Sequence, residues 1–246
     1  MKSIILCEGS TDWVLLQYFM RKTYEWEDKR TNEQPRGKHI KRIRTMEKGA
    51  DRLSIGSCGG ASKILSGFDF ILERNNLSQD TEDYERIVVI TDRDDTETEE
   101  KFINGIKETL ENRGLNPISE ICNNEWIQCN YKNVYGKDKQ INLLVLIIPF
   151  ETTGAMETFL LKCISEQDDY DARIIQKSEN FVDSVDEEQR YLKKRRYITK
   201  AKFDVYFSVR TAADQFLERQ NILKNVEWEN YIKVQKDFEK LSQLSS

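Results

Sequence analysis

Acidic residues follow three apolar stretches of the chain, and their spacing suggests a chemical site. Glu8 follows the first stretch, Asp92 and Asp94 follow another, and Glu157 comes shortly after the most apolar one. Open α/β sheets bind ligands outside the carboxyl ends of their strands, so we expect these side chains to meet at one sheet edge. Clustered carboxylates repel one another and need either a cation or raised pKa values. Mg²⁺ takes oxygen ligands of this kind, often one or two carboxylates together with substrate phosphates.

The remaining composition narrows the metal chemistry to carboxylates. The 246 residues include one histidine, His39, and five cysteines, no two of which form a C-x-x-C pair. Sites built from several histidines and zinc cages of four cysteines are therefore excluded. We expect the cysteines to be free structural thiols.

The segment E-G-S-T-D, which begins at Glu8, places a second acidic residue close to the first. Gly9 would let the backbone approach a ligand closely. Asp12 lies four residues after Glu8, in the first turn of an expected helix. Its carboxylate could face the same site or could cap the helix, and both interpretations stay open.

Four apolar runs predict the strands that would position these side chains. They are residues 3–7, 52–57, 84–91 and 141–148, and segments with a helical apolar period follow the first three. Near-continuous apolar strands joined by helical crossovers are typical of a mainly parallel sheet flanked by helices. The sequence therefore predicts an α/β fold.

The same pattern predicts how the chain is divided. Residues 1–165 form the expected core, in which the polar, weakly patterned residues 23–50 are an insertion over the surface. Residues 166–246 form a helical C-terminal extension packed on the core. Within it we expect helices over residues 168–195, 212–223 and 228–241.

Two strings in the core carry a family resemblance. IILCEGSTD (residues 4–12) resembles the first Toprim motif, a hydrophobic strand that ends in Glu-Gly with an acidic residue soon after. IVVITDRDD (residues 87–95) resembles the second, a hydrophobic strand that ends in Asp-x-Asp. SCGGASKI (57–64) and PFETTGAMETFLL (149–161) are similar to the glycine pair and the glutamate-bearing helix of small stand-alone Toprim proteins of the overcoming-lysogenization-defect (OLD) type.

The resemblance implies a Rossmann-like Toprim core that hydrolyses phosphodiester bonds of DNA or RNA with Mg²⁺ or Mn²⁺. It makes Glu8 a metal ligand or proton carrier, and Asp92 and Asp94 metal ligands. Asp12 and Glu157 would complete a second metal site of the OLD type. OLD-like nucleases also use a downstream lysine, for which Lys200 and Lys202 are candidates, and we choose Lys202. The residues expected to contact substrate are Gly9, Gly59, Gly60, Lys63, Arg195 and Arg196.

The charge distribution bears on the expected nucleic-acid partner. The formal net charge is −5, which is unfavourable for binding phosphates. Basic residues are concentrated, however, in residues 38–44 and 190–202. Each basic run could bind phosphate or could simply be a solvated face.

Other absences from the sequence limit the expected partners and location. No Walker motif, G-x-x-x-x-G-K-[ST], occurs, so the ATPase of a complete OLD phage-defence protein would have to be a separate chain. No apolar stretch approaches the ~18 residues that a membrane span needs, and the N-terminal residues lack the apolar region of a signal peptide. We therefore expect a cytoplasmic protein without a membrane anchor.

Three other interpretations remain open. Residues 92–96 satisfy D-x-D-x-T, the motif of haloacid-dehalogenase-type phosphatases, although that family places it on the first strand of the chain. A Toprim-like core could also serve as a non-catalytic binding or sensor subunit. Finally, the acidic residues at the strand ends could be ordinary helix caps and turn formers.

Overall fold

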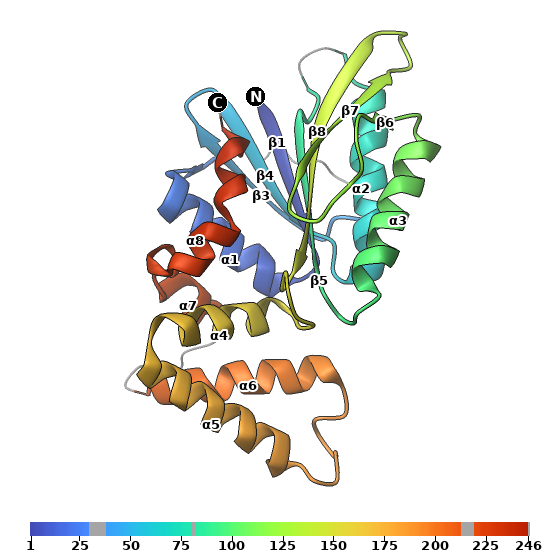
Figure 1. Cartoon of the computed structure of the whole chain (residues 1–246). Coiled ribbons are helices and arrows are strands. Elements are labelled where there is room, and N and C mark those ends of the chain that lie inside the picture. Colours follow the sequence, from blue (N-terminus) through green and yellow to red (C-terminus); the bar gives the residue numbers. More distant parts are fainter. Residues whose placement is uncertain (30–37, 80–81, 213–218, 246) are drawn as a thin grey trace.

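The computed structural model describes residues 1–29, 38–79, 82–212 and 219–245. Within these ranges the chain forms an eight-stranded sheet with the order β2-β3-β4-β1-β5-β8-β7-β6 (Figure 1). The strands are β1 (Lys2–Cys7), β2 (Glu27–Asp28), β3 (Arg42–Lys48), β4 (Asp51–Ser57), β5 (Arg86–Asp92), β6 (Asn116–Pro117), β7 (Trp126–Lys132) and β8 (Asp138–Ile148).

The four central strands, β4, β1, β5 and β8, run parallel and correspond to the four predicted apolar runs. Their register places Ile5 beside Ile55 and Val88, and Val88 beside Leu144. All four side chains are fully buried. The predicted α/β class is confirmed, and the carboxyl ends of these strands share one edge of the sheet.

Both flanks of the sheet are antiparallel, and one of them differs from the prediction. β3 pairs with β4, and β7 pairs with β8. The expectation of a surface insertion over residues 23–50 is wrong for residues 42–48, which form β3; residues 30–37 lie outside the described ranges. Of the seven residues of β3, only Thr45 and Met46 are buried. Flanking strands of this kind carry charges on their exposed side, so β3 lacks a continuous apolar run.

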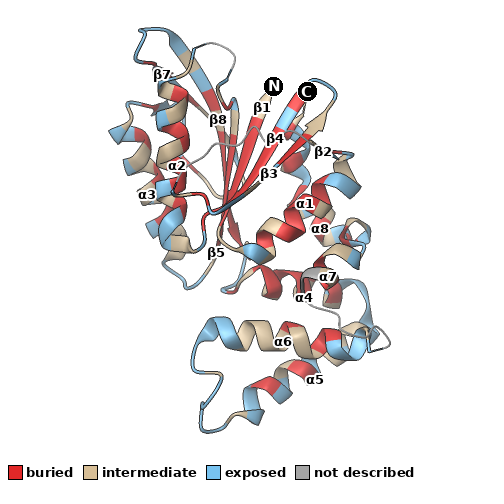
Figure 2. Ribbon diagram, turned by 180° about the vertical axis from the view of Figure 1, so that it is seen from behind, coloured by how far each residue is buried: buried red, intermediate tan, exposed pale blue. Residues whose placement is uncertain are grey.

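Helices cover the two faces of the sheet because alternate residues of each strand point to opposite sides. Ile4 and Leu6 belong to the core beneath α2 (Ala61–Asn76) and α3 (Thr98–Asn112). Ile5 and Cys7 belong to the core shared with the helices of the other face. Those helices are α1 (Ser10–Tyr24), α4 (Met156–Gln167), α7 (Arg219–Asn225) and α8 (Ile232–Asp237). Figure 2 shows the central strands buried between these layers.

The C-terminal third is helical, as predicted, but its helix boundaries differ. α5 (Asp169–Val185) ends ten residues before the predicted limit at residue 195, and α6 (Arg195–Arg210) begins there. Asp186 ends α5, because its carboxylate accepts backbone N–H groups of the next loop, from Tyr191 at 2.8 Å and Leu192 at 2.7 Å. Of the helix predicted over residues 212–223, residues 213–218 lie outside the described ranges.

α5 and α6 form an antiparallel hairpin that projects past α4 beyond the carboxyl edge of the sheet (Figure 1). Lys202 pairs with Asp183 at 2.8 Å near one end of the hairpin, and Arg210 lies 3.9 Å from Asp171 at the other. The chain then returns to the sheet through α7, the 3-10 helix η1 (Trp228–Asn230), α8 and the 3-10 helix η2 (Glu239–Leu244). In the described part of the chain, no helix is long and apolar enough to cross a lipid bilayer.

Candidate active site

The glycine pair after β4 supports the backbone of Glu8. The N–H groups of Gly59 and Gly60 both donate to the Glu8 carbonyl oxygen, at 2.8 and 3.0 Å. The two glycines have φ values of +82° and +136°, which side chains disfavour. A Cβ atom on Gly59 would lie 2.5 Å from Cδ of Lys41, so the Lys41 side chain crosses this turn. The glycine pair is therefore part of the site, and it brings Lys41 from the first basic run beside it.

The Glu8 carboxylate lies between the ends of β1 and β5. Its Oε2 atom is 3.5 Å from the hydroxyl of Thr91, which precedes the terminal residue of β5. Partial burial and the nearby charge of Asp94 raise the pKa of Glu8, although N–H donation from Asp92 and Ala61 opposes the rise. Glu8 is thus exposed enough to meet a ligand and is more readily protonated than an ordinary glutamate.

Three further carboxylates surround Glu8, and each accepts a hydrogen bond; Asp12 and Glu157 are buried, and Asp92 is partly buried. Asp92 accepts from the backbone N–H of Met156, at the start of α4, at 3.1 Å. Asp12 accepts from the backbone N–H of Gly9 at 2.8 Å, so it caps α1. Glu157 accepts from the hydroxyl of Thr11 at 3.0 Å. The segment that follows β1 and the start of α4 therefore place acidic groups against the end of β5.

Burial and mutual repulsion raise the pKa values of two of these groups. The pKa of Asp12 rises to about 7, mainly because the carboxyl is buried and also because Glu157 and Glu8 lie nearby. Burial raises the pKa of Asp92 well above its ordinary value, and the charges of Asp12, Glu8 and Glu157 add to the rise. No lysine or arginine of the described residues forms an ion pair with any of these four carboxylates. These four carboxylates lie near one another without a described lysine or arginine paired to them, and Asp94, which was expected among them, is not one of the four.

The donor set suits a hard divalent cation, because it offers only oxygen atoms. In the described ranges, however, no group of three or more acidic, cysteine or histidine side chains is disposed to hold a metal ion by itself. Asp12 and Glu157 are turned toward Gly9 and Thr11. Mg²⁺ often uses one or two carboxylates together with substrate phosphates and water, so Glu8 and Asp92 fit an ion whose other ligands come from the substrate.

Asp94 lies near Glu8 but is exposed, and it contacts the helical hairpin. Its side chain is 62% exposed, and its Oδ1 atom accepts from Nη2 of Arg195 at 3.0 Å. The same nitrogen donates to the carbonyl oxygens of Gly154 at 3.1 Å and Arg93 at 3.3 Å. Arg195, predicted to contact phosphate, therefore joins the start of α6 to the loop after β5.

The sequence did not single out Arg93, which fixes that loop. Its Nε donates to the carbonyl oxygen of Pro149 at 2.7 Å, and Nη2 donates to that of Phe150 at 2.9 Å. It also pairs with Glu99 at the start of α3. Its position between the two aspartates is the only sequence signal that could have indicated this role. Arg93 holds together the loops that follow β5 and β8.

The other predicted site residues form no ion pair with the carboxylates in the described part of the chain. Lys63 is exposed on α2. The ammonium group of Lys202 pairs with Asp183, and its side chain lines a cavity of about 210 Å³ that also borders Gly154 and Arg195. Arg196 is exposed on α6. The structure therefore brings Glu8, Asp12, Asp92 and Glu157 together but gives Lys202 no contact with them.

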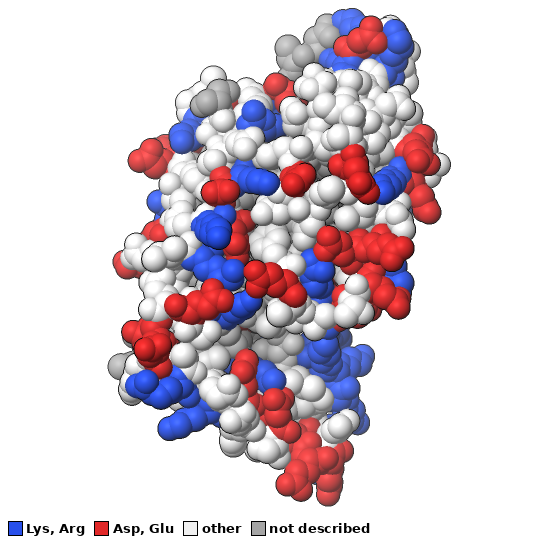
Figure 3. Space-filling view, in the orientation of Figure 1, with Lys and Arg blue, Asp and Glu red and all other residues white. Residues whose placement is uncertain are grey.

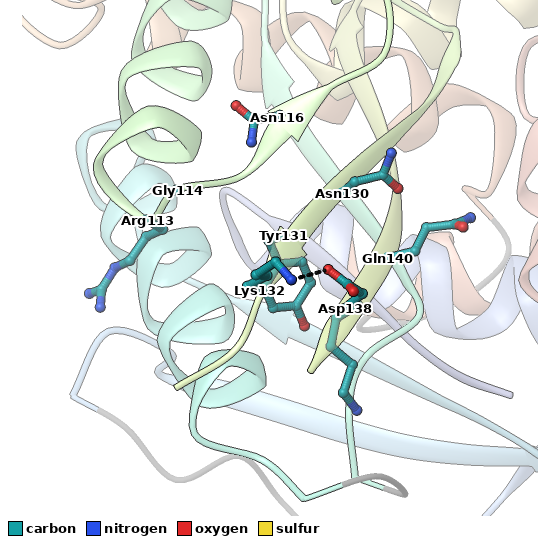
Figure 4. A pocket seen from close by; sticks show the side chains of 9 residues that line it. Arg113, Gly114, Asn116, Asn130, Tyr131, Lys132, Asp138 and Gln140 are labelled. Atoms are coloured by element: carbon teal, nitrogen blue, oxygen red, sulfur yellow. Dashed lines mark ion pairs between the residues drawn. The ribbon is translucent and has the colours of Figure 1, made fainter. Parts of the chain in front are cut away.

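A hollow of about 730 Å³ lies elsewhere, between the end of α3 and the strands β7 and β8 (Figure 4). Its basic side chains are already neutralised: Lys132 pairs with Asp138 at 3.0 Å and Arg113 with Asp69 at 2.6 Å. In Figure 4 the Arg113 side chain points away from the strands. This hollow lies at the amino end of β8, and its lining includes none of the four carboxylates of the candidate site.

Solved structures were compared with this fold. Hypothetical protein PH0156 from Pyrococcus horikoshii OT3 matches with a TM-score of 0.59 at 17% identity, over 99% of this chain and 97% of that one. At this identity the similarity shows the fold alone. A glyoxalase/bleomycin resistance protein/dioxygenase family enzyme from Burkholderia phytofirmans PsJN matches 58% of this chain and 96% of its own at 10% identity. Its TM-score of 0.20 supports no argument.

Sequence comparisons give a family. No curated protein matches the chain. A family model described as "Protein of unknown function (DUF3226)" matches residues 2–241. Because this match spans nearly the whole chain, the protein belongs to the DUF3226 family.

Proposed function

We propose that this protein is a divalent-metal-dependent phosphodiesterase that acts on nucleic acid. The observation that carries the proposal is the meeting of Glu8, Asp12, Asp92 and Glu157 from three different strand ends without a basic partner. Acidic residues that only cap helices or form turns would not have to lie so close that their four carboxylates repel one another. The resemblance of residues 4–12 and 87–95 to the Toprim motifs supports the same chemistry.

Glu8 and Asp92 are the residues that would hold Mg²⁺ or Mn²⁺, and Asp94 would join them once it leaves Arg195. When bound, the ion supplies positive charge that offsets both the carboxylates and a substrate phosphate. Glu8 reaches solvent, and its raised pKa makes it a better proton acceptor than an ordinary glutamate. Asp12 and Glu157, fixed by Gly9 and Thr11, line the inner wall of the site with oriented carboxyl groups.

One observation favours a second candidate, a non-catalytic binding or sensor subunit. The described residues include no group of three ligands disposed to hold an ion by itself. A site of this kind could bind a phosphate-bearing ligand through a loosely held ion without hydrolysing it. A haloacid-dehalogenase-type phosphatase has no such support, because its D-x-D-x-T motif follows β5 here and not the first strand of the chain.

The proposal includes a cellular setting that the resemblance implies. The protein would act in the cytoplasm on DNA or RNA, and an ATPase chain of an OLD-like phage-defence system is a possible partner. The absence of a membrane-spanning helix in the described residues is compatible with this setting. Co-purification of a tagged chain with an ATPase would test the partner separately from the chemistry.

The direct test is hydrolysis by the purified protein. Plasmid, single-stranded DNA and total RNA are incubated with Mg²⁺ or Mn²⁺, with a chelator as the blank. Glu8→Gln keeps the shape of the side chain but removes its charge and its proton acceptance, so activity should fall about 100-fold or more. Glu151→Gln is the matched control, because Glu151 lies in the loop after β8, is exposed, and pairs only with Lys162.

Full activity in Glu8→Gln would contradict the proposed mechanism. Metal-dependent binding of nucleic acid without turnover, abolished in Glu8→Gln and kept in Glu151→Gln, would instead support the non-catalytic subunit.

A further inference from the structure

The turn between α5 and α6 carries a surface of exposed aromatic and basic side chains. Tyr191 is 71% exposed, and Tyr197, in the first turn of α6, is 41% exposed. The guanidinium of Arg190 lies 5.4 Å from the ring centroid of Tyr191, and that of Arg196 lies 5.0 Å from that of Tyr197. We call the following residues the tyrosine–cation surface: Arg190, Tyr191, Lys193, Lys194, Arg196, Tyr197 and Lys200.

The cations of this surface form no ion pair in the described part of the chain, although Asp186, Glu187 and Glu188 precede them and Lys193 interacts with the Asp186 carboxylate. Among the described residues, no ion pair involves Arg190, Lys193, Lys194, Arg196 or Lys200. By contrast, Lys101, Lys132 and Arg113 on other surfaces are each paired with a carboxylate. In Figure 3, Lys and Arg side chains gather on the side of the molecule where α6 begins. A protein with a net charge of −5 thus presents concentrated positive charge in one place.

The position of these cations is unfavourable for the helix itself. The N-terminus of a helix carries partial positive charge and is stabilised by acidic residues. The first turn of α6 has none, and Lys194, Arg195 and Arg196 occupy its start. Local helix stability therefore does not explain these residues, whereas binding of an anionic ligand does.

The tyrosine–cation surface is connected to the carboxylates. Arg195, which lies within this stretch, donates to Asp94 at 3.0 Å and to the carbonyl oxygen of Gly154 at 3.1 Å. Asp94 in turn raises the pKa of Glu8 by its charge. A strand lying along this surface would therefore reach the end of β5.

We propose that this surface binds single-stranded nucleic acid, with bases stacked on Tyr191 and Tyr197 and phosphates contacted by Lys194 and Arg196. Stacking on aromatic side chains combined with basic groups is the general means of binding single strands without sequence preference. In a duplex the bases are paired inside the helix and cannot reach such rings. That the bound strand is also the substrate rests on the proposed function; the binding itself does not.

The test measures the affinity of a fluorescein-labelled 20-nucleotide single strand, as DNA and as RNA, by anisotropy in the presence of EDTA. Tyr191→Ala and Tyr197→Ala should each weaken binding about tenfold, and the double variant about 100-fold. Tyr→Phe at both positions keeps the rings and should change affinity less than twofold. Duplex DNA of the same sequence should bind more weakly, with little dependence on the tyrosines.

A matched control lies at the other end of the same hairpin. Tyr170 is 66% exposed, and the Arg173 guanidinium lies 5.6 Å from its ring centroid. Tyr170 is adjacent to Asp171, which meets the end of α6, so it is remote from the proposed surface. Tyr170→Ala should leave the affinity unchanged.

The outcomes separate this inference from the proposed hydrolysis. Wild-type affinity in the Tyr191→Ala/Tyr197→Ala double variant, or no binding by the wild type at low salt, overturns the inference even if the protein proves to be a nuclease. Tyrosine-dependent binding by a protein that hydrolyses nothing with Mg²⁺ or Mn²⁺ upholds the inference and removes the proposed function. A difference between the DNA and RNA arms identifies the preferred strand.

Discussion

Asp12 shows how one side chain can belong both to the fold and to a site. As a cap it accepts the N–H of Gly9, which the helix α1 needs. As an acid it lies buried among Glu8, Asp92 and Glu157, so its ionised form is disfavoured and its pKa rises to about 7. Of the two interpretations that the sequence left open, capping is the one that the structure shows, and metal contact stays a prediction. The capping contact is observed, and the negative charge makes the site attractive to a cation.

The raised pKa of Asp12 predicts how stability changes with pH in metal-free protein. The unfolded chain ionises this group near its ordinary value of 3.8 and the folded chain near 7, so its contribution to stability is lost as pH rises between these values. Asp12→Asn keeps an oxygen for the Gly9 N–H but cannot ionise. We expect the variant to be more stable than the wild type at pH 8 by a few kcal/mol, and the difference to shrink toward pH 5.

Thermal unfolding in EDTA across this pH range measures the effect. A variant that is less stable than the wild type by the same amount at pH 5 and pH 8 would show that Asp12 is only a cap, with no charge repulsion to relieve.

At the scale of elements, the sequence predicted the parts of the fold that are buried on both sides. Residues 87–90 and 143–148 are continuous apolar runs because helices cover both faces of β5 and β8. The acidic groups at the strand ends could be predicted for the same reason, since a parallel sheet gathers strand ends at one edge. β3 and the break between α5 and α6 could not, because charged residues dominate both segments. Their structure depends on contacts with distant residues, such as those of Met46 with the core and of Arg195 with Asp94.

Substitution of Met46 tests whether β3 contributes to the stability of the sheet. It is fully buried in the same core as α1 and lies opposite Leu53 of β4. Met46→Ala should lower the free energy of unfolding by about 2–5 kcal/mol, as expected when a buried methionine is truncated. Arg44→Ala, at an exposed position of the same strand, should cost no more than about 1 kcal/mol.

Chemical denaturation of the two variants decides this point. Equal, small effects would mean that residues 42–48 behave as the surface insertion that the sequence first suggested.

At the scale of the whole molecule, the carboxylates of the candidate site and the unpaired cations of the hairpin occupy different places. The carboxylates lie inside the sheet edge, while the unpaired cations lie on the hairpin beside it. A nucleic acid approaching this acidic protein would be attracted mainly at that one place. Net charge alone, which argued against such a partner, does not describe the surface that the partner would meet.

This separation predicts the salt dependence of binding. If four cations of the tyrosine–cation surface contact phosphates of a single strand, the logarithm of the association constant should fall with that of salt concentration with a slope of about −3. Lys194→Ala together with Arg196→Ala should make the slope shallower by about 1.4. Lys22→Ala with Lys132→Ala changes the net charge equally on other surfaces, and should leave the slope unaltered.

A titration of anisotropy against salt gives both slopes. Identical slopes for the two double variants would mean that the affinity depends only on the net charge of the protein.

The contact between Arg195 and Asp94 has a consequence for how the molecule responds to ligands. Arg195 of the hairpin pairs with the Asp94 carboxylate in the observed structure. A divalent ion bound at the sheet edge would compete with Arg195 for the same oxygen atoms. If the proposed ion binds Asp94, the two equilibria would be linked, and linkage is reciprocal: the ion would weaken docking of the hairpin by the same free energy by which docking weakens ion binding. Binding of an ion at the sheet edge would thereby change the position of the start of α6. The affinity of α6 for a nucleic-acid strand would then depend on whether the ion is bound.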